Sequence, residues 1–277
     1  MRKGKILGRI ITYSILILGA FISLIPFYWL IRSSLMELHQ IFIMPPIWIP
    51  YPIMLSNYME ALTVLPFLRY LINTLTIVIF AVSGVILTSS ICAYSFARIR
   101  WYGRDMVFSI ILTSMMLPFA VTLIPTFIGW RFLGAINTFV PLIVPAWFGG
   151  GAFNIFLLRQ FFLTIPKELD ESAYIDGARH FKIYTSIILP LTKPALIVVG
   201  LFSFLSTWND FLGPLVFLMD ESRYTLALGL QLFVGLYNAQ WHLMMAAATV
   251  VLLPAIVVFL LGQKYFIEGI TMTGLKG

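Results

Sequence analysis

The residues best suited to chemistry in this chain gather in one stretch, residues 165–190, which we call the polar segment. It contains four acidic residues and four basic or titratable ones: Glu168, Asp170, Glu171 and Asp176, with Lys167, Arg179, His180 and Lys182. Long apolar runs flank the polar segment on both sides. A charged stretch between two membrane spans needs a surface outside the membrane to contact, so we expect a protein partner there.

Sequence motifs of the common enzymes are missing. The chain has no Gly-x-x-x-x-Gly-Lys-Ser/Thr loop, so we do not expect it to bind ATP itself. Its three histidines, His39, His180 and His242, are too scattered for a metal site. Cys92 is the single cysteine, so no intrachain disulfide is expected. We therefore expect no enzyme activity and no cofactor bound by this chain.

Composition indicates a membrane protein. Of the 277 residues, 60% are hydrophobic and 10% are charged, and the mean hydropathy is +0.97. An average soluble domain carries about 25% charged residues. A helix needs roughly 20 mostly apolar residues to cross the bilayer core. Six runs are therefore expected to be spans, and the fold to be all-α: residues 10–31, 71–97, 106–130, 139–161, 195–218 and 243–266.

Three regions are expected along the chain. Residues 1–69 hold an N-terminal segment, a first span too long for a signal-peptide core, and a proline-rich loop. Residues 70–266 form the core, and residues 267–277 form a tail. Within the core, Pro118 is expected to be tolerated inside the third span. The run of Gly149, Gly150 and Gly151 is expected to loosen the fourth span.

Basic residues predict the orientation, because Lys and Arg gather on the cytoplasmic side of short loops. Of the 18 Lys and Arg residues, all but four fall at the two termini, after span two or around the polar segment. The exceptions are Arg32, Arg69, Arg131 and Arg223. Both termini and the polar segment of this multi-pass chain are therefore expected in the cytoplasm. The net charge of +7 is a topology signal, and no nucleic-acid partner is expected.

Local signals divide the polar segment into two helices. Pro166 suits the first turn of a helix, and the acidic residues concentrate near the N-terminus of that helix, where the dipole favours them. Gly177 supplies the break. The second helix is expected from about residue 178 to 189, with an apolar stripe formed by Phe181, Tyr184 and Ile188.

The spacing in this segment resembles a family signature. Glu171-Ser172-Ala173, then Gly177, then Ile187-x-Leu189-Pro190 is similar to the Glu-Ala-Ala (EAA) motif of permease subunits of ATP-binding cassette importers. The one departure is Ser172, a small residue in place of another. The resemblance implies a type I importer permease fold whose coupling helix, about residues 166–189 between spans four and five, docks on a cytoplasmic ATPase. The residues implied in that docking are Glu171, Ser172, Ala173, Asp176, Gly177 and Ala178.

Other stretches resemble the six-span permease of carbohydrate importers of the maltose type: residues 44–50 with 57–58, residues 207–211, which include Trp-Asn-Asp, and residues 263–269 with 274–277. The resemblance implies a sugar importer in the cytoplasmic (inner) membrane of a bacterium or archaeon, where membrane lipid surrounds the chain. Its partners would be a second permease, two ATPase subunits that hold ATP and Mg, and an external solute-binding protein that delivers the carbohydrate. The alternative is a non-transporting scaffold or sensor subunit that binds a cytoplasmic partner.

Candidate residues for the substrate path are Trp208, Asn209, Asp210 and Asn154. An acid within a span is costly and usually functional, but Asp210 is equally suited to capping a broken helix. Trp208 is suited to packing between helices as well as to stacking on a sugar ring. In the outer loop, the candidate contacts with the binding protein are Tyr237, Asn238 and Trp241, and a plain interface anchor is the alternative.

Overall fold

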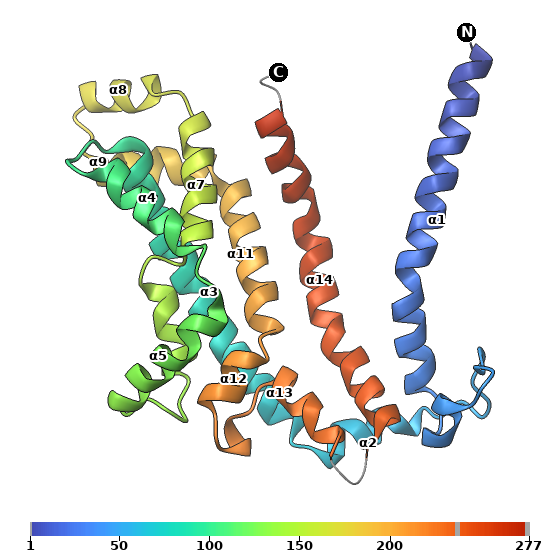
Figure 1. Ribbon diagram of the computed structural model, residues 1–277. Coiled ribbons are helices and arrows are strands. Elements are labelled where there is room, and N and C mark those ends of the chain that lie inside the picture. Colours follow the sequence, from blue (N-terminus) through green and yellow to red (C-terminus); the bar gives the residue numbers. More distant parts are fainter. Residues whose placement is uncertain (1, 236–238, 275–277) are drawn as a thin grey trace. The chain divides into compact units, whose positions relative to one another are not determined.

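The computed structural model describes residues 2–235 and 239–274, with side-chain surroundings for residues 8–235 and 239–265 (Figure 1). Among these residues the regular secondary structure is helical, and the pairing of extended backbone is limited to an isolated bridge between Val234 and Ala239. The predicted all-α fold is confirmed.

Internal contacts divide the chain into two compact units. The first unit consists of Met1–Phe67 and Gly229–Leu253, and the second of Leu68–Leu228 and Pro254–Gly277. The first contains α1 (Arg2–Ser34), η1 (Leu38–Phe42), α2 (Ser56–Val64), η5 (Gln231–Phe233) and the start of α14 (Trp241–Gly274), while α13 (Leu226–Leu230) crosses the boundary. The expected regions are continuous in the sequence. Each compact unit, by contrast, combines two separate parts of the chain.

The second unit holds the remaining elements. It begins with α3 (Phe67–Arg98), α4 (Arg104–Ser114), α5 (Phe119–Phe132), α6 (Val140–Ile143), η2 (Val144–Trp147) and α7 (Ala152–Thr164). The polar segment follows as α8 (Glu168–Ile175), α9 (His180–Ile183), the π-helix η3 (Tyr184–Ile188) and α10 (Leu189–Leu191). The unit continues with α11 (Lys193–Trp208), α12 (Leu212–Phe217) and η4 (Glu221–Arg223).

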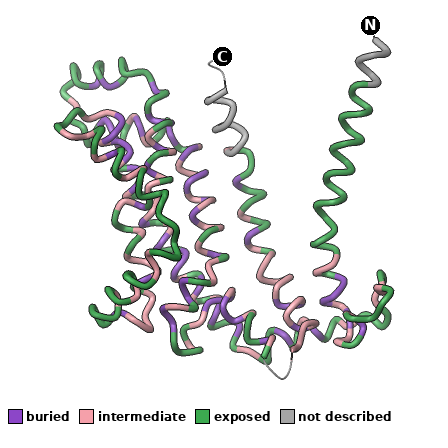
Figure 2. The backbone as a smooth tube through the Cα atoms, in the orientation of Figure 1, coloured by how far each residue is buried: buried purple, intermediate pink, exposed green. Residues whose placement is uncertain are grey.

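In the first unit, a polar anchor fixes the loop after α1. The buried Asn57 side chain donates to the carbonyl oxygens of Ser34 at 3.0 Å and Met36 at 2.8 Å. Next to it, the Tyr58 hydroxyl pairs with the Ser34 hydroxyl at 2.6 Å. By contrast, the apolar stretch of α1 is exposed along almost its whole length (Figure 2). Such a surface is suited to lipid.

The described helices account for up to six membrane spans. Four stretches are long and apolar enough to cross a membrane: Gly8–Ser34, Phe67–Arg98, Val140–Thr164 and Trp241–Tyr265. Two bent pairs qualify if each pair counts as one span: Arg104–Ser114 with Phe119–Phe132, and His180–Leu191 with Lys193–Trp208. Helices therefore lie in all six expected regions; in the fifth region only Lys193–Trp208 of the bent pair overlaps the expected span, because His180–Leu191 lies almost wholly in the polar segment.

The third and fifth expected spans are broken. The third was expected to continue through Pro118, but α4 ends at Ser114 and α5 begins after Pro118 with a bend of 100°. Proline lacks the N–H that a continuing helix requires, and its ring collides with the preceding turn. The fifth was expected to reach residue 218, but α11 ends at Trp208 and a separate short helix, α12, follows.

The fourth span is loosened where the glycines predicted it. Gly149, Gly150 and Gly151 have φ angles of +92°, +66° and +90°, which separate η2 from α7. These left-handed angles favour glycine, because a β-carbon would crowd the backbone there. The glycines also let this stretch approach α3 closely, since a β-carbon on Gly150 would lie 2.6 Å from the Val85 carbonyl oxygen.

The core of the second unit lies under the polar segment. Buried residues of α3, α7, α8, the π-helix and α11 form one cluster, which includes Tyr94, Leu158, Phe162, Ala173 and Ile188. Figure 2 shows buried residues recurring among exposed ones along these helices. The polar segment is thus packed against the spans of its own unit and is not a loosely solvated loop.

Candidate functional site

The helix α8 presents one face to the core and the other to solvent. Asp170 and Ala173 are buried, whereas Glu171, Ser172 and Asp176 are exposed. Three acids lie in the first turn of the helix, where they interact favourably with the helix dipole. The exposed acids are therefore free to meet another surface. In Figure 1, α8 lies at the same end of the unit as α9 and the start of α4.

A Schellman motif closes α8. The Gly177 N–H donates to the Tyr174 carbonyl oxygen at 3.0 Å, and the Ala178 N–H donates to the Ala173 carbonyl oxygen at 2.9 Å. This pattern needs a left-handed residue just past the helix end, and Gly177 supplies it with φ +81°. Ala173 and Ala178 both pack at the core cluster. Two of the small residues in the motif thus shape the helix end itself.

The solvent side of the polar segment also carries apolar side chains that were not among the predicted docking residues. Ile175 is 87% exposed and Phe181 is 76% exposed. Of the three residues in the expected apolar stripe, Tyr184 and Ile188 are buried, whereas Phe181 is exposed. The exposure of Ile175 could have been inferred from the sequence. It lies two positions after Ala173, and residues two apart point to different sides of a helix. Exposed apolar groups with a rim of polar residues are typical of a protein-binding surface.

Asp170 is held by a partner from α3. Its Oδ2 lies 3.2 Å from Nη1 of Arg98, and both side chains are almost fully buried. Burial raises the pKa of the Asp170 carboxyl above its ordinary value, and the charge and hydrogen bond of Arg98 oppose that rise without cancelling it. The pair fixes α8 to the end of α3.

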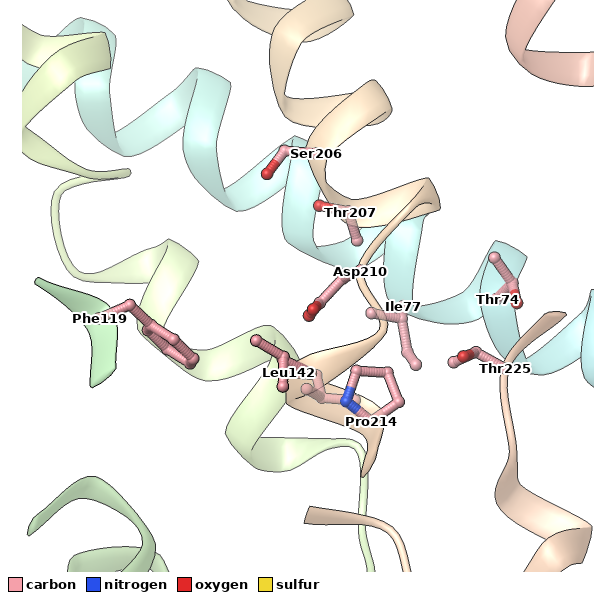
Figure 3. Close-up of a pocket in the computed structure, with 10 residues that line it drawn as sticks. Thr74, Ile77, Phe119, Leu142, Ser206, Thr207, Asp210, Pro214 and Thr225 are labelled. Atoms are coloured by element: carbon pink, nitrogen blue, oxygen red, sulfur yellow. The ribbon is translucent and has the colours of Figure 1, made fainter. Parts of the chain in front are cut away.

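A cavity of about 300 Å³ is lined by residues of α3, α5, α6, α11 and α12 (Figure 3). Its wall combines hydroxyls, one carboxylate and apolar side chains: Thr74, Ile77, Phe119, Leu142, Ser206, Thr207, Asp210, Leu212, Pro214 and Thr225. The side chain of Asp210 extends toward Leu142. Its Oδ1 accepts a hydrogen bond from the Gly213 N–H at 3.0 Å. Asp210 therefore both stabilises the start of α12 and lines the cavity.

The other candidates for the substrate path lie in different surroundings. Trp208 is 2% exposed and its ring stacks on Phe204, 5.4 Å between centroids, outside the wall of this cavity. The Asn209 amide donates to the Leu205 carbonyl oxygen at 2.8 Å at the end of α11. Asn154 lines a second cavity of about 240 Å³, which shares Ser206 and Thr207 with the first. The structure thus places Asp210 and Asn154 at neighbouring cavities.

Two of the three candidates in the outer loop, Tyr237 and Asn238, lie outside the described residues. Trp241 begins α14 and is half-buried. Among the described residues, no group of three or more His, Cys, Asp or Glu side chains is arranged to hold a metal ion.

Comparison with known proteins identifies the class. Residues 84–271 match the family described as binding-protein-dependent transport system inner membrane component. Because the match covers more than half of the chain, this chain belongs to that family. The structure resembles a crystal structure of a bacterial ABC transporter involved in the import of the acidic polysaccharide alginate, with TM-score 0.82 and 26% identity over 96% of this chain and 98% of that one.

Relatives of similar length are similar to this chain along almost its whole sequence. The trehalose/maltose transport system permease protein MalG of Thermococcus litoralis is 34% identical over 99% of both chains. The sulfoquinovosyl glycerol transport system permease protein SmoH of Agrobacterium fabrum is 30% identical, over 99% of this chain and 95% of that protein. The MetNI methionine transporter shares the fold at TM-score 0.54 and 16% identity. The predicted type I importer permease fold is confirmed.

Proposed function

We propose that this chain is one of two permease subunits of an ATP-driven carbohydrate importer in a bacterial or archaeal inner membrane. The observation that carries the proposal is the exposed surface of α8. This surface presents acids and apolar side chains at the EAA motif, and the Schellman motif at Gly177 closes the helix there. Family membership supports the transport role, and the named sugar and polysaccharide systems among the relatives support a carbohydrate substrate.

The polar segment faces the cytoplasm in this proposal, as do both chain ends, because most basic residues lie on that side. Two ATPase subunits, which hold ATP and Mg, dock on this chain and on its partner permease. Docking on this chain uses Glu171, Ser172 and Asp176 directly, while Ala173, Gly177 and Ala178 set the shape of the helix end. ATP-driven closure of the ATPases moves the segment, and an external binding protein delivers the sugar from the other side.

A transport assay tests this function. Cells that lack the chain are compared with cells that regain it, with labelled mono- and oligosaccharides offered as competing substrates. Restored uptake of at least one carbohydrate, together with an ATPase subunit and a sugar-binding protein that purify with the chain, is the expected result. A chain that restores no uptake but still retains a cytoplasmic partner would instead be a scaffold or sensor.

Asp210 is assigned to the substrate path, with Asn154 at the adjoining cavity. In the Asp210→Asn variant, the side-chain oxygen that accepts from Gly213 remains, so the start of α12 stays capped. The charge at the cavity wall is lost, and we expect carbohydrate uptake to fall roughly tenfold while the complex still assembles, as for the loss of a charge-assisted hydrogen bond. Uptake kinetics and co-purification of the ATPase measure both effects.

Asp220→Asn is the matched control for this change. Asp220 also accepts a backbone hydrogen bond, from Ser222 at 2.8 Å, but it is exposed and lies outside the cavity wall. Its uptake should equal that of the unchanged chain. If Asp210→Asn also transports normally, Asp210 serves as a helix cap and has no part in the path.

A further inference from the structure

One face of α3 carries three polar side chains, spaced four residues apart, that the proposed function leaves unexplained. Ser90, Tyr94 and Arg98 lie one above another, because residues at i and i+4 share a helix face. Ser90 and Tyr94 are buried, and the Arg98 side chain is 2% exposed. Polar groups buried in this way are expected to be committed to specific partners. We call these three residues the α3 row.

Each member of the α3 row forms hydrogen bonds with a different part of the polar segment, and Arg98 also bonds the end of α7. The Arg98 guanidinium pairs with Asp170 of α8 and donates to the carbonyl oxygens of Phe162 and Ile165, both at 2.7 Å. Those two carbonyls belong to the end of α7, where helices leave such groups unpaired. One side chain thus joins the end of α7 to the beginning of α8.

The other two members bond the second half of the polar segment. The Tyr94 hydroxyl donates to the carbonyl oxygen of His180 at 3.2 Å, at the start of α9. The Ser90 hydroxyl pairs with the Tyr184 hydroxyl at 2.7 Å, and the Tyr94 and Tyr184 rings pack with centroids 5.2 Å apart. Tyr184 opens the π-helix, an irregular turn of a kind often found at functional sites. Both halves of the polar segment are therefore attached to the same face of one helix.

The opposite end of α3 is attached to the wall of the Asp210 cavity. The Asn73 side chain donates to the carbonyl oxygens of Ser222 at 3.0 Å and Tyr224 at 2.9 Å. The Thr74 hydroxyl accepts from the Leu226 N–H at 2.9 Å, and Thr74 itself lines the cavity. At about 1.5 Å of rise per residue, Thr74 and Arg98 lie roughly 36 Å apart along the axis.

Between these ends α3 is continuous. It contains no proline from Phe67 to Arg98, whereas the α4–α5 pair is bent by 100° and the pair that ends in α11 is bent by 78°. A continuous helix moves as a rigid element, and coupling between distant sites travels through such elements. A shift of the polar segment relative to α3 would also separate the buried Arg98–Asp170 pair, which is strongly unfavourable.

We propose that Ser90, Tyr94 and Arg98 are positioning residues that attach the polar segment to α3, and that the continuous α3 then acts as a rigid rod that carries displacement of the polar segment to the wall of the Asp210 cavity. The part of this proposal that concerns ATP rests on the proposed docking of an ATPase. The attachment of the polar segment to α3 does not, and it can be measured separately.

Two variants of the assembled transporter test the ATP-linked part. Arg98→Gln replaces the charged guanidinium by a shorter, neutral amide. The double variant Ser90→Ala/Tyr94→Phe removes only two hydroxyl groups. In both, we expect the ATPase to co-purify in normal amount while sugar transported per ATP hydrolysed falls roughly tenfold, within the usual range of coupling energies. The control is Arg100→Gln, an exposed arginine two residues further on, which should keep the normal ratio.

A normal ratio of transport to hydrolysis in both variants of the α3 row would overturn the proposal. If Arg98→Gln fails to accumulate, the double hydroxyl variant decides, because it leaves the ion pair and the packing in place. A lower ratio that is accompanied by loss of the ATPase from the complex would also count against the proposal, since the rod acts after docking.

A distance measurement tests the rod directly. Spin labels are placed at Ile175→Cys on α8 and Ile79→Cys on α3, two exposed positions, in a Cys92→Ser background. When the α3 row is intact, the distribution of distances between the labels should be narrow and should stay the same on addition of ATP. In the Arg98→Gln variant this distribution should broaden. A distance that shifts on ATP binding with the row intact would overturn the rod. If no ATPase binds at all, the proposed function fails, and the broadening in Arg98→Gln still decides the attachment.

Discussion

The Gly177→Leu variant is expected to reach the membrane and to lose about 99% of its ATP-driven uptake, which corresponds to roughly 3 kcal/mol of lost interaction with the ATPase. Gly177 holds a φ of +81° at the closed end of α8. A side chain there strains the backbone by about 1–2 kcal/mol. A β-carbon at Gly177 has no atom within 4 Å, and the residue lies in an exposed turn, so a larger side chain begins in open space. The part of the loss that exceeds this strain is then expected to come from the surface that docks there.

Two further substitutions at this position separate backbone strain from bulk. Asparagine visits left-handed angles with little penalty, whereas alanine does not. If strain alone matters, Gly177→Asn should transport normally and Gly177→Ala should be impaired. If a closely docked partner matters, as we expect, Gly177→Ala should keep more uptake than either Gly177→Asn or Gly177→Leu. Normal uptake and normal ATPase retention in Gly177→Leu would contradict docking at this turn.

A charge reversal tests the same surface without touching the backbone of the turn. Glu171→Lys changes an exposed acid in the EAA motif and should uncouple ATP hydrolysis from uptake. Glu168→Lys places the same change on another exposed acid of the same first turn, outside the motif. The helix dipole is disturbed similarly in both variants, so a loss confined to Glu171→Lys locates the contact at the motif.

The Gly150→Ala variant is expected to be the most destabilised alanine substitution among the three consecutive glycines before α7. Its β-carbon would lie 2.6 Å from the Val85 carbonyl oxygen and 2.9 Å from the Ser89 β-carbon, both on α3. The φ of +66° adds backbone strain. Overpacking typically costs about 1–3 kcal/mol and left-handed strain about 1–2 kcal/mol. We therefore expect a loss of roughly 3 kcal/mol in the free energy of unfolding, measured in detergent.

Gly151→Ala is the control for this prediction. Gly151 has a similar left-handed φ of +90°, but the nearest atom to its β-carbon would be the Asn154 amide nitrogen at an ordinary 3.8 Å. With ψ 143° this conformation is one that glycine adopts far more readily than other residues, so Gly151→Ala should show backbone strain of about 1–3 kcal/mol without overpacking, and lose less stability than Gly150→Ala. Equal losses in the two variants would mean that α3 does not approach this turn as closely as described, and that the three glycines serve only the local backbone.

Local chemistry made much of the polar segment predictable. The acids at the beginning of α8 and the break at Gly177 depend on residues only a few positions apart, and the structure shows both of them. The ion pair of Asp170 was not predictable, because its partner Arg98 is 72 positions away. Nothing local distinguishes Asp170 from the exposed Glu171 except its place on the same helix face as Ala173.

The interiors of the spans were harder to read. Periodicity and apolar content predicted where spans lie, but two of them are broken. Prolines within membrane helices have two outcomes: Pro118 separates α4 from α5, while Pro125 lies inside α5. The outcome depends on neighbours that satisfy the freed carbonyls, which the sequence does not reveal. Likewise, the motif around Trp208 suggested one site, whereas Trp208 packs on Phe204 and Asp210 lines the cavity.

The most direct test of the docking surface is a photo-crosslink from its most exposed apolar residue. A photoreactive side chain is placed at Ile175 on α8, which is 87% exposed, and for comparison at Met219, which is 58% exposed and lies after α12. Both variants are illuminated in membranes that contain the assembled transporter. We expect the ATPase subunit to be captured from position 175 and not from position 219. No capture from position 175, or equal capture from both positions, would contradict the central claim.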